Sequence, residues 1–110
     1  VFDGRIYVLD SLTRRISVFA GKSVVGRYDL SSLPFPMSFA LDGEGRLYVL
    51  DGHLAKVVVL NEEGKVVTEM GRLGWKEGEF YHPRYLLLNK RGMLFVVDTG
   101  NDRVQIFRLR

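Results

Sequence analysis

A seven-residue pattern occurs three times in this 110-residue chain and restricts the possible folds more than any other feature. Each copy begins with glycine, continues with mostly apolar residues and ends with aspartate: GRIYVLD at 4–10, GRLYVLD at 45–51 and GMLFVVD at 92–98. Five residues after each aspartate, a basic residue opens a second apolar run, at 15–19, 56–60 and 103–107. A repeat of forty-odd residues built from short β-rich runs is typical of a β-propeller blade rather than of a helical repeat.

The turn residues divide each repeat into strands. The glycine-led runs predict the second strand of each blade (5–9, 46–50 and 93–97), and the base-led runs predict the third. Glycine-containing turns precede the outermost strands at 23–28 and 65–70, and proline opens the innermost strands at 36–42 and 83–89. We therefore predict an all-β fold of four-stranded antiparallel blades in an incomplete propeller. Its parts are blade 1 at 1–30 without its innermost strand, blade 2 complete at 36–70, and blade 3 at 83–110 without its outermost strand.

Several predicted strands are apolar on both faces, as at 86–88 (LLL) and 95–97 (FVV). Both faces of such strands need to be buried. A two-layer sandwich leaves one face of each sheet in water, whereas radially packed blades cover both faces of their inner strands. The continuous apolar runs therefore favour a propeller.

Two segments resemble the NHL repeat: GRLGWKEGEFYHP at 71–83 and VDTGNDRVQIF at 97–107. Spaced glycines, a Phe three residues before Pro and an Asp-Thr-Gly-Asn-x-Arg-Val turn carry the resemblance, which covers residues 43–110. The first repeat departs from it, because 28–36 lacks the glycines and Ser11-Leu12-Thr13 replaces Thr-Gly-Asn. The resemblance implies an NHL-type propeller, usually six-bladed, that mostly serves as a scaffold for proteins, RNA or small ligands. A minority of relatives are lyases or lactone hydrolases.

Composition excludes some classes of site. The chain has no cysteine, so it has no disulfide and no thiolate ligand or nucleophile. No apolar run is long enough to span a membrane and no signal-like segment is present, so we expect a soluble chain without membrane insertion, in an unknown compartment. The net charge of +3 comes from bases spread among acids, as on a solvated surface.

The aspartates that end the three patterns invite a functional interpretation, since a ring of carboxylates around a channel could hold calcium. Repetition in every blade favours a structural role, in which each carboxylate accepts hydrogen bonds from backbone amides of its turn. The following bases are expected to brace the same turns. The predicted structural residues are Asp10, Asp51, Asp98, Arg15, Lys56 and Arg103. Asp98, Asn101 and Asp102 do not have the spacing of a calcium-binding EF-hand loop.

Chain direction brings certain loops to one end of the blades: those between second and third strands, and those that lead into the next innermost strand. We expect the binding face there, with these candidate partner-binding residues: Arg14, His53, Trp75, Lys76, Tyr81, His82 and Arg84. Aromatic and arginine side chains are frequent at protein interfaces and also stack on single-stranded RNA. Phe80 and Trp75 have an alternative role as fillers between adjacent blades.

His53 and His82 are the only histidines and weak candidates for zinc ligands. A catalytic zinc site usually has three protein ligands, so a third would have to come from elsewhere. Peptidylamidoglycolate lyases, which are propellers of related type, use such a site. No Gly-x-Ser-x-Gly elbow or phosphate-binding loop is present, and we expect no catalytic residues and no cofactor.

The sequence thus favours a non-enzymatic binding or assembly scaffold that presents loops to a protein or another polymer. Two alternatives stay open: a fragment of a metal-dependent propeller lyase or hydrolase, with zinc or calcium, and an RNA-binding NHL module. Because the predicted blades at 1–30 and 83–110 lack strands, we expect open strand edges. These edges would pair with the rest of a longer propeller or with further copies of the chain.

Overall fold

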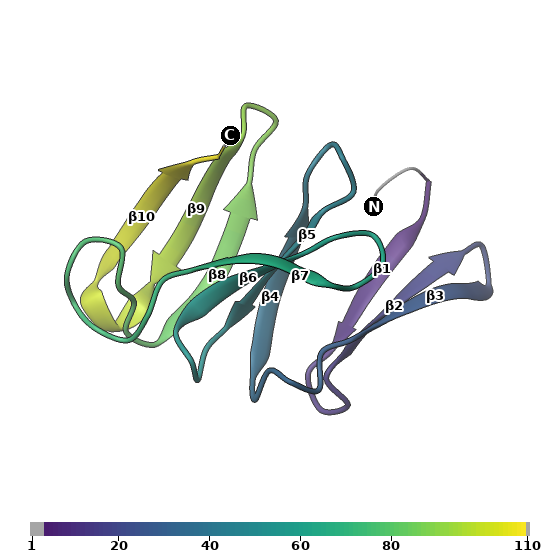
Figure 1. Ribbon diagram of the computed structural model, residues 1–110, viewed down its shortest axis with the longest axis horizontal. Helices are drawn as coiled ribbons and strands as arrows, with labels where there is room; N and C mark the ends of the chain where they lie inside the picture. Colours follow the sequence, from purple (N-terminus) through teal and green to yellow (C-terminus); the bar gives the residue numbers. More distant parts are fainter. Residues whose placement is uncertain (1–3, 110) are drawn as a thin grey trace.

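The computed structural model describes residues 4–109, which form three antiparallel sheets placed side by side like the blades of a fan (Figure 1). The first blade contains β1 (Ile6–Asp10), β2 (Arg15–Ala20) and β3 (Ser23–Asp29). The second contains β4 (Pro36–Leu41), β5 (Leu47–Asp51), β6 (Lys56–Leu60) and β7 (Val66–Met70). The third contains β8 (Pro83–Leu88), β9 (Met93–Asp98) and β10 (Arg103–Arg108), with a 3-10 turn, η1 (Thr99–Asn101), between the last two.

The predicted fold class is confirmed: the chain is all-β, and its sheets are one four-stranded and two three-stranded propeller blades. The bounds of the ten strands differ from the sequence predictions by at most one residue. Residues 1–3 and 110, which belong to the predicted first and third blades, lie outside the described residues. The three-stranded sheets have the orders β1-β2-β3 and β8-β9-β10, and the four-stranded sheet runs β4-β5-β6-β7.

The turns that lead into β5 and β9 show why each pattern begins with glycine. Asp42 Oδ1 accepts hydrogen bonds from the amides of Glu44 and Arg46, both at 2.9 Å, and Asn89 Oδ1 plays the same part in the third blade. Closing these turns requires a left-handed backbone, with φ of 81° at Gly45 and 77° at Gly92. Glycine adopts this conformation without steric cost.

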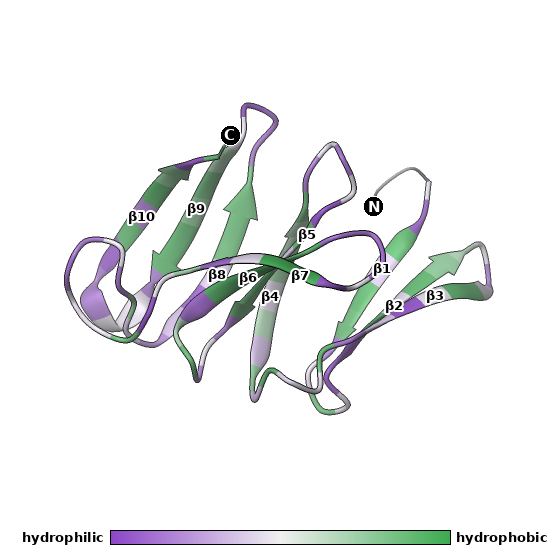
Figure 2. Ribbon diagram, in the orientation of Figure 1, coloured by the Kyte–Doolittle hydropathy of each residue, from purple (hydrophilic) through white to green (hydrophobic). Residues whose placement is uncertain are grey.

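The strands β5 and β6 of the second blade are buried on both faces, as their continuous apolar sequences require, whereas β7 is exposed. One face packs against the first blade through Leu47, Val49, Val58 and Leu60. The other face packs against the third blade through Tyr48, Leu50, Val57 and Val59. Figure 2 shows the strands as mostly apolar and the turns between them as polar.

Loops between blades complete these two cores. Phe80, which precedes β8, is fully buried and packs edge to face on Phe107 with ring centroids 5.9 Å apart. Leu30 and Leu33, in the loop before β4, are buried between the first and second blades in the same way. The alternative role proposed for Trp75 as a filler is wrong, because its side chain is 77% exposed.

The third blade differs from the sequence prediction, because only one of its faces is buried. Leu86 points into the core, whereas Leu87 is 58% exposed, so burial of both faces of 86–88 is wrong for the described structure. Two cross-strand rows of apolar side chains lie on the open face: Tyr85, Val97 and Val104, and Leu87, Phe95 and Ile106. No element among residues 4–109 covers them, because the second blade packs only on the opposite face.

Candidate functional site

A cleft lies between the second and third blades, at the end where β5 leads into β6 and the long loop 71–82 leads into β8. Its volume is about 480 Å³. We call it the loop-face cleft. It is lined by Phe35, Met37, Gly52, His53, Leu73, Tyr81, His82, Pro83 and Arg84.

The cleft is held on one side by Asp51, a fully buried carboxylate at the end of β5. Its Oδ1 accepts hydrogen bonds from the amides of His53 at 2.9 Å and Leu54 at 2.7 Å, and these bonds close the turn. Its Oδ2 accepts a further bond from the Phe35 amide at 2.8 Å. One carboxylate therefore fixes two segments of the cleft that lie far apart in the sequence.

Asp98, its repeat equivalent, is also fully buried and fixes the other side. Its Oδ1 accepts a hydrogen bond from the Tyr81 amide at 2.7 Å, and its Oδ2 accepts bonds from Asn101 Nδ2 at 2.8 Å and Arg103 Nε at 3.2 Å. The side chain makes no capping bond to the η1 turn, so its contacts differ from the expected bonds to amides of its own turn. Asp10, in the first blade, is exposed, and its carboxylate accepts bonds from the amides of Leu12 and Thr13.

The three bases that follow these aspartates make different contacts. Arg103 bonds Asp98 and also donates through Nη2 to the carbonyls of Lys76 and Glu79, both at 2.8 Å, which ties the long loop to β10. Lys56 instead pairs with Glu69 on the neighbouring strand at 2.7 Å. Arg15 Nε donates to Thr13 Oγ1 at 3.2 Å.

The long loop 71–82 is ordered by its own polar contacts as well. Glu79 accepts bonds from the Lys76 amide at 3.1 Å and Arg72 Nε at 2.9 Å. The pKa of the Glu79 carboxyl is lowered first by the Lys76 amide bond and then by Arg72. Neither Trp75 nor Lys76 lines the cleft.

Of the seven candidate partner-binding residues, four line this one cleft: His53, Tyr81, His82 and Arg84. Arg14 does not, and donates instead to the Ser31 carbonyl at 3.2 Å, beside the first blade. Three apolar lining residues were missed: Phe35, Met37 and Leu73. The position of Phe35 and Met37 on either side of Pro36 was an available signal, because that proline marks where the chain enters a blade.

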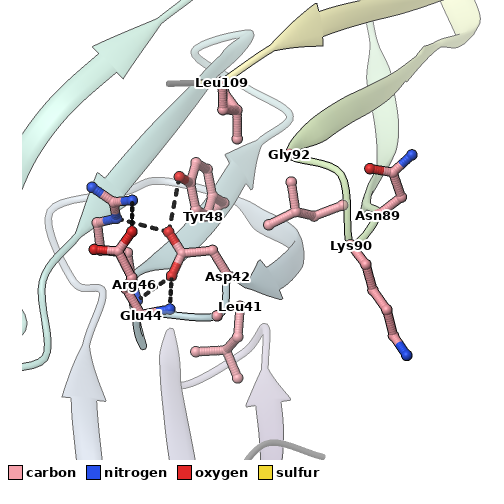
Figure 3. Close-up of a pocket in the computed structure, with 11 residues that line it drawn as sticks. Leu41, Asp42, Glu44, Arg46, Tyr48, Asn89, Lys90, Gly92 and Leu109 are labelled. Carbon is pink, nitrogen blue, oxygen red and sulfur yellow. Dashed lines mark hydrogen bonds and ion pairs between the residues drawn. The ribbon is translucent and has the colours of Figure 1, made fainter.

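A second cleft, of about 470 Å³, lies at the opposite ends of β4 and β8 (Figure 3). Asp42 Oδ2 accepts bonds there from Arg46 Nε at 2.7 Å and the Tyr48 hydroxyl at 3.2 Å. Burial alone would raise the pKa of Asp42, but hydrogen bonds from the Arg46 side chain and amide and from the Glu44 amide hold it below its ordinary value. Burial, and then the Asp42 carboxylate, raises the pKa of Tyr48. Because these polar groups bond one another, we assign them a structural role.

Two further observations bear on the class of site. Within residues 4–109, no group of three or more His, Cys, Asp or Glu side chains is arranged to hold a metal ion. No helix in this described part of the chain is long and apolar enough to cross a membrane.

No family model matches the chain. Among solved structures, the chain is similar to one described as streptogramin B lyase, a β-propeller protein, with a TM-score of 0.68. The similarity covers 96% of this chain and 37% of that chain, at 16% sequence identity. The chain thus spans little more than a third of that protein, and a likeness at this identity shows the propeller fold alone.

Proposed function

We propose that this chain is part of an NHL-type propeller that acts as a binding module and takes its partner, a protein segment, in the loop-face cleft. The observation that carries the proposal is the meeting of His53 with Tyr81, His82 and Arg84 in one cleft, from two chain segments that lie far apart in the sequence. The buried carboxylates of Asp51 and Asp98 support it, because they hold the lining segments in place before any partner binds. Preorganised loops reduce the entropy lost on binding.

The chemistry of the lining also favours binding. Tyr81 and Phe35 present exposed aromatic surface, at 45% and 47%, beside an arginine. Aromatic and arginine side chains supply most of the affinity in protein interfaces. The cleft thus has a suitable composition for an anchor side chain of a partner.

Site-specific photocrosslinking tests this function. A photoreactive phenylalanine analogue replaces Leu73 beside the cleft, and a matched chain carries it at Lys90 on the opposite cleft. We expect a discrete crosslinked partner from position 73 in extracts of the source cells, reduced by Arg84→Gln in the same chain. Identical crosslinked species from both positions would contradict the proposal.

A metal-dependent lyase is the second candidate, favoured by the two histidines in the loop-face cleft together with the structural likeness to a lyase-named protein. No third ligand joins the histidines within residues 4–109, so a metal would need one from another segment. The metal content of the purified full-length protein separates the two candidates. The lyase predicts about one metal ion per chain that is lost in His53→Ala, and the binding module predicts metal far below that ratio.

A further inference from the structure

The loop-face cleft gathers positive and hydrogen-bond-donating side chains without any acid. Arg84, His53 and His82 line it, and none of its nine lining residues is Asp or Glu. Each imidazole has at least one N–H to donate in any protonation state, and the guanidinium always carries its charge. The polar part of the lining is therefore complementary to an anion.

Within residues 4–109, Arg84 forms no ion pair. The ion pairs formed within residues 4–109 engage Arg46, Lys56, Arg72 and Arg103. Asp51 and Asp98, which hold the cleft segments, are fully buried and occupied by the donors that hold the turns. Glu79, two residues before Tyr81 in the sequence, pairs with Arg72. An exposed arginine in a concave site, without an acid beside it, is suited to pair with a carboxylate or phosphate of a ligand.

The rest of the lining is apolar and aromatic. Phe35 and Leu73 are 47% and 64% exposed, and Met37 lies between the blades. The rings of Tyr81 and His82 contact each other at a tilt of 56°, with centroids 4.2 Å apart. Apolar walls with a few convergent polar groups are the usual composition of ligand pockets, and a volume of about 480 Å³ falls within their range.

The backbone of His82 is strained where it enters the cleft. Four residues other than glycine have left-handed φ within residues 4–109, and three of them, Arg14, Ala55 and Asp102, occupy the same turn position in successive blades. The fourth, His82 with φ of 50°, breaks this pattern. Its repeat equivalent, Phe35, has no such φ. Strain that is not part of the repeated framework is typical of functional positions.

The strained segment is held in place from the third blade. The Tyr81 amide donates to Asp98, and the Tyr81 carbonyl accepts a bond from the Gly100 amide at 2.8 Å. A Cβ at Gly100 would overlap Tyr81, so only glycine permits this approach. His82 and Arg84 are thus presented to the cleft by a fixed backbone.

We propose that the loop-face cleft binds an organic anion: a carboxylate or phosphate carried next to an apolar or aromatic group. Arg84 pairs with the anion, His53 and His82 donate hydrogen bonds to it, and Phe35 and Tyr81 contact the apolar part. The inference rests on the proposed function in taking this cleft as the binding site. It adds the chemical class of what is bound there, as an acidic segment of a partner next to an aromatic residue.

NMR titration of the full 110-residue chain tests the inference with three small probes. Phenylacetate carries ring and charge, phenylacetamide carries the ring alone, and acetate carries the charge alone. We expect phenylacetate to shift the amide resonances of Leu73, Tyr81 and His82 at concentrations at least tenfold lower than the other two probes. Binding of phenylacetamide as tight as that of phenylacetate would overturn the inference.

Two matched variants test whether the positive charge of Arg84 binds the anion. Arg84→Gln and Arg91→Gln each remove one positive charge, and Arg91 is exposed at the opposite end of β8 and β9. Losing a charge-assisted hydrogen bond corresponds to about tenfold or more in affinity, so we expect Arg84→Gln to weaken phenylacetate binding by about that factor and Arg91→Gln to leave it unchanged. Equal effects of the two variants would overturn the role of Arg84, and an unchanged amide spectrum verifies that each variant is folded.

A competition experiment with peptides distinguishes this inference from the proposed function. A blocked tetrapeptide Ala-Glu-Phe-Ala is added to the phenylacetate complex, with Ala-Gln-Phe-Ala as its control. Displacement by the Glu peptide alone supports both proposals. If neither peptide displaces phenylacetate, the anion site stands as a site for free small molecules and the protein partner is refuted. If both peptides displace it equally, anion recognition in the partner is refuted and the partner-binding function stands.

Discussion

Removing the Asp51 carboxylate tests whether this buried group holds the loop-face cleft together. Its two oxygens accept three backbone amides, from Phe35, His53 and Leu54, at 2.7–2.9 Å, and its side chain is fully buried. A buried donor left without a partner costs about 1–3 kcal/mol. The lower value applies to each of these amides, because the residues that carry them reach the surface. We therefore expect Asp51→Ala to lower the free energy of unfolding by about 3 kcal/mol.

Asp10→Ala is the matched control in the same repeat position. Asp10 is exposed and bonds only two amides, at 3.0 Å and 3.2 Å, which water can replace. We expect this substitution to cost about 0.5 kcal/mol or less. Asp51→Asn is expected to cost an intermediate amount of stability, about 1–2 kcal/mol. Its one remaining oxygen still accepts bonds from the His53 and Leu54 amides, while the new NH₂ group faces the amide of Phe35 and cannot accept its hydrogen bond.

Urea unfolding followed by far-ultraviolet circular dichroism measures these differences, since Trp75 is too exposed to report on the core. Hydrogen exchange adds a local readout, in which the Phe35 amide loses its protection in Asp51→Ala and keeps it in Asp10→Ala. If the two alanine variants lose the same stability, the reasoning from buried acceptors is refuted.

Three further predictions follow from the packing and the charges. Phe80→Ala is expected to lower the free energy of unfolding by about 3–5 kcal/mol, because the ring is fully buried against Phe107. Thermal unfolding measures this loss, and a loss below about 1 kcal/mol would contradict the packing argument. The pKa of Asp42 is lowered in the folded state, so the ionised carboxylate stabilises the fold at pH values above its ordinary pKa of 3.8. This stabilisation is lost as the pH falls through the pKa that Asp42 has in the folded protein. The difference in the free energy of unfolding between wild type and Asp42→Asn, measured by urea unfolding at a series of pH values, should therefore decrease below pH 3.8. A difference that does not depend on pH would contradict this prediction. The 110-residue polypeptide is expected to self-associate through the open face of the third blade. Leu87→Lys is therefore expected to reduce the native mass measured by light scattering, and equal masses of wild type and variant would show that this face is not the contact.

The open faces of the outer blades have a simple explanation in the repeat itself. Val97 and Val104 are the repeat equivalents of Leu50 and Val57, which are buried against the third blade. The third blade thus presents the same kind of face that its neighbour buries. Contiguous exposed apolar rows of this kind are typical of interaction surfaces. This is why self-association is the expected behaviour of the polypeptide.

The sequence by itself determined the strands, because they depend on local patterns. Glycine sits where a turn needs a left-handed backbone, as at Gly45, and proline opens strands at Pro36 and Pro83. Short apolar runs between these signals, repeated every forty-odd residues, favour strands. Fold class and strand bounds therefore followed from the chain without any long-range information.

Tertiary structure decided which side chains act together. His53 and Arg84 were candidates from their positions in the chain, but their meeting with Phe35 and Leu73 in one cleft depends on how neighbouring blades pack. Local patterns also assigned Asp98 to its own turn, whereas in the fold its carboxylate holds Tyr81 from 17 residues away in the chain.

Which apolar side chains are buried also depends on the tertiary structure. Leu86 and Leu87 are identical in type and adjacent in the chain, yet one is buried and the other is 58% exposed. Only the presence of a blade on one side and not the other distinguishes them. Hydrophobicity is a property of the residue, and its burial depends on the neighbour that packs against it.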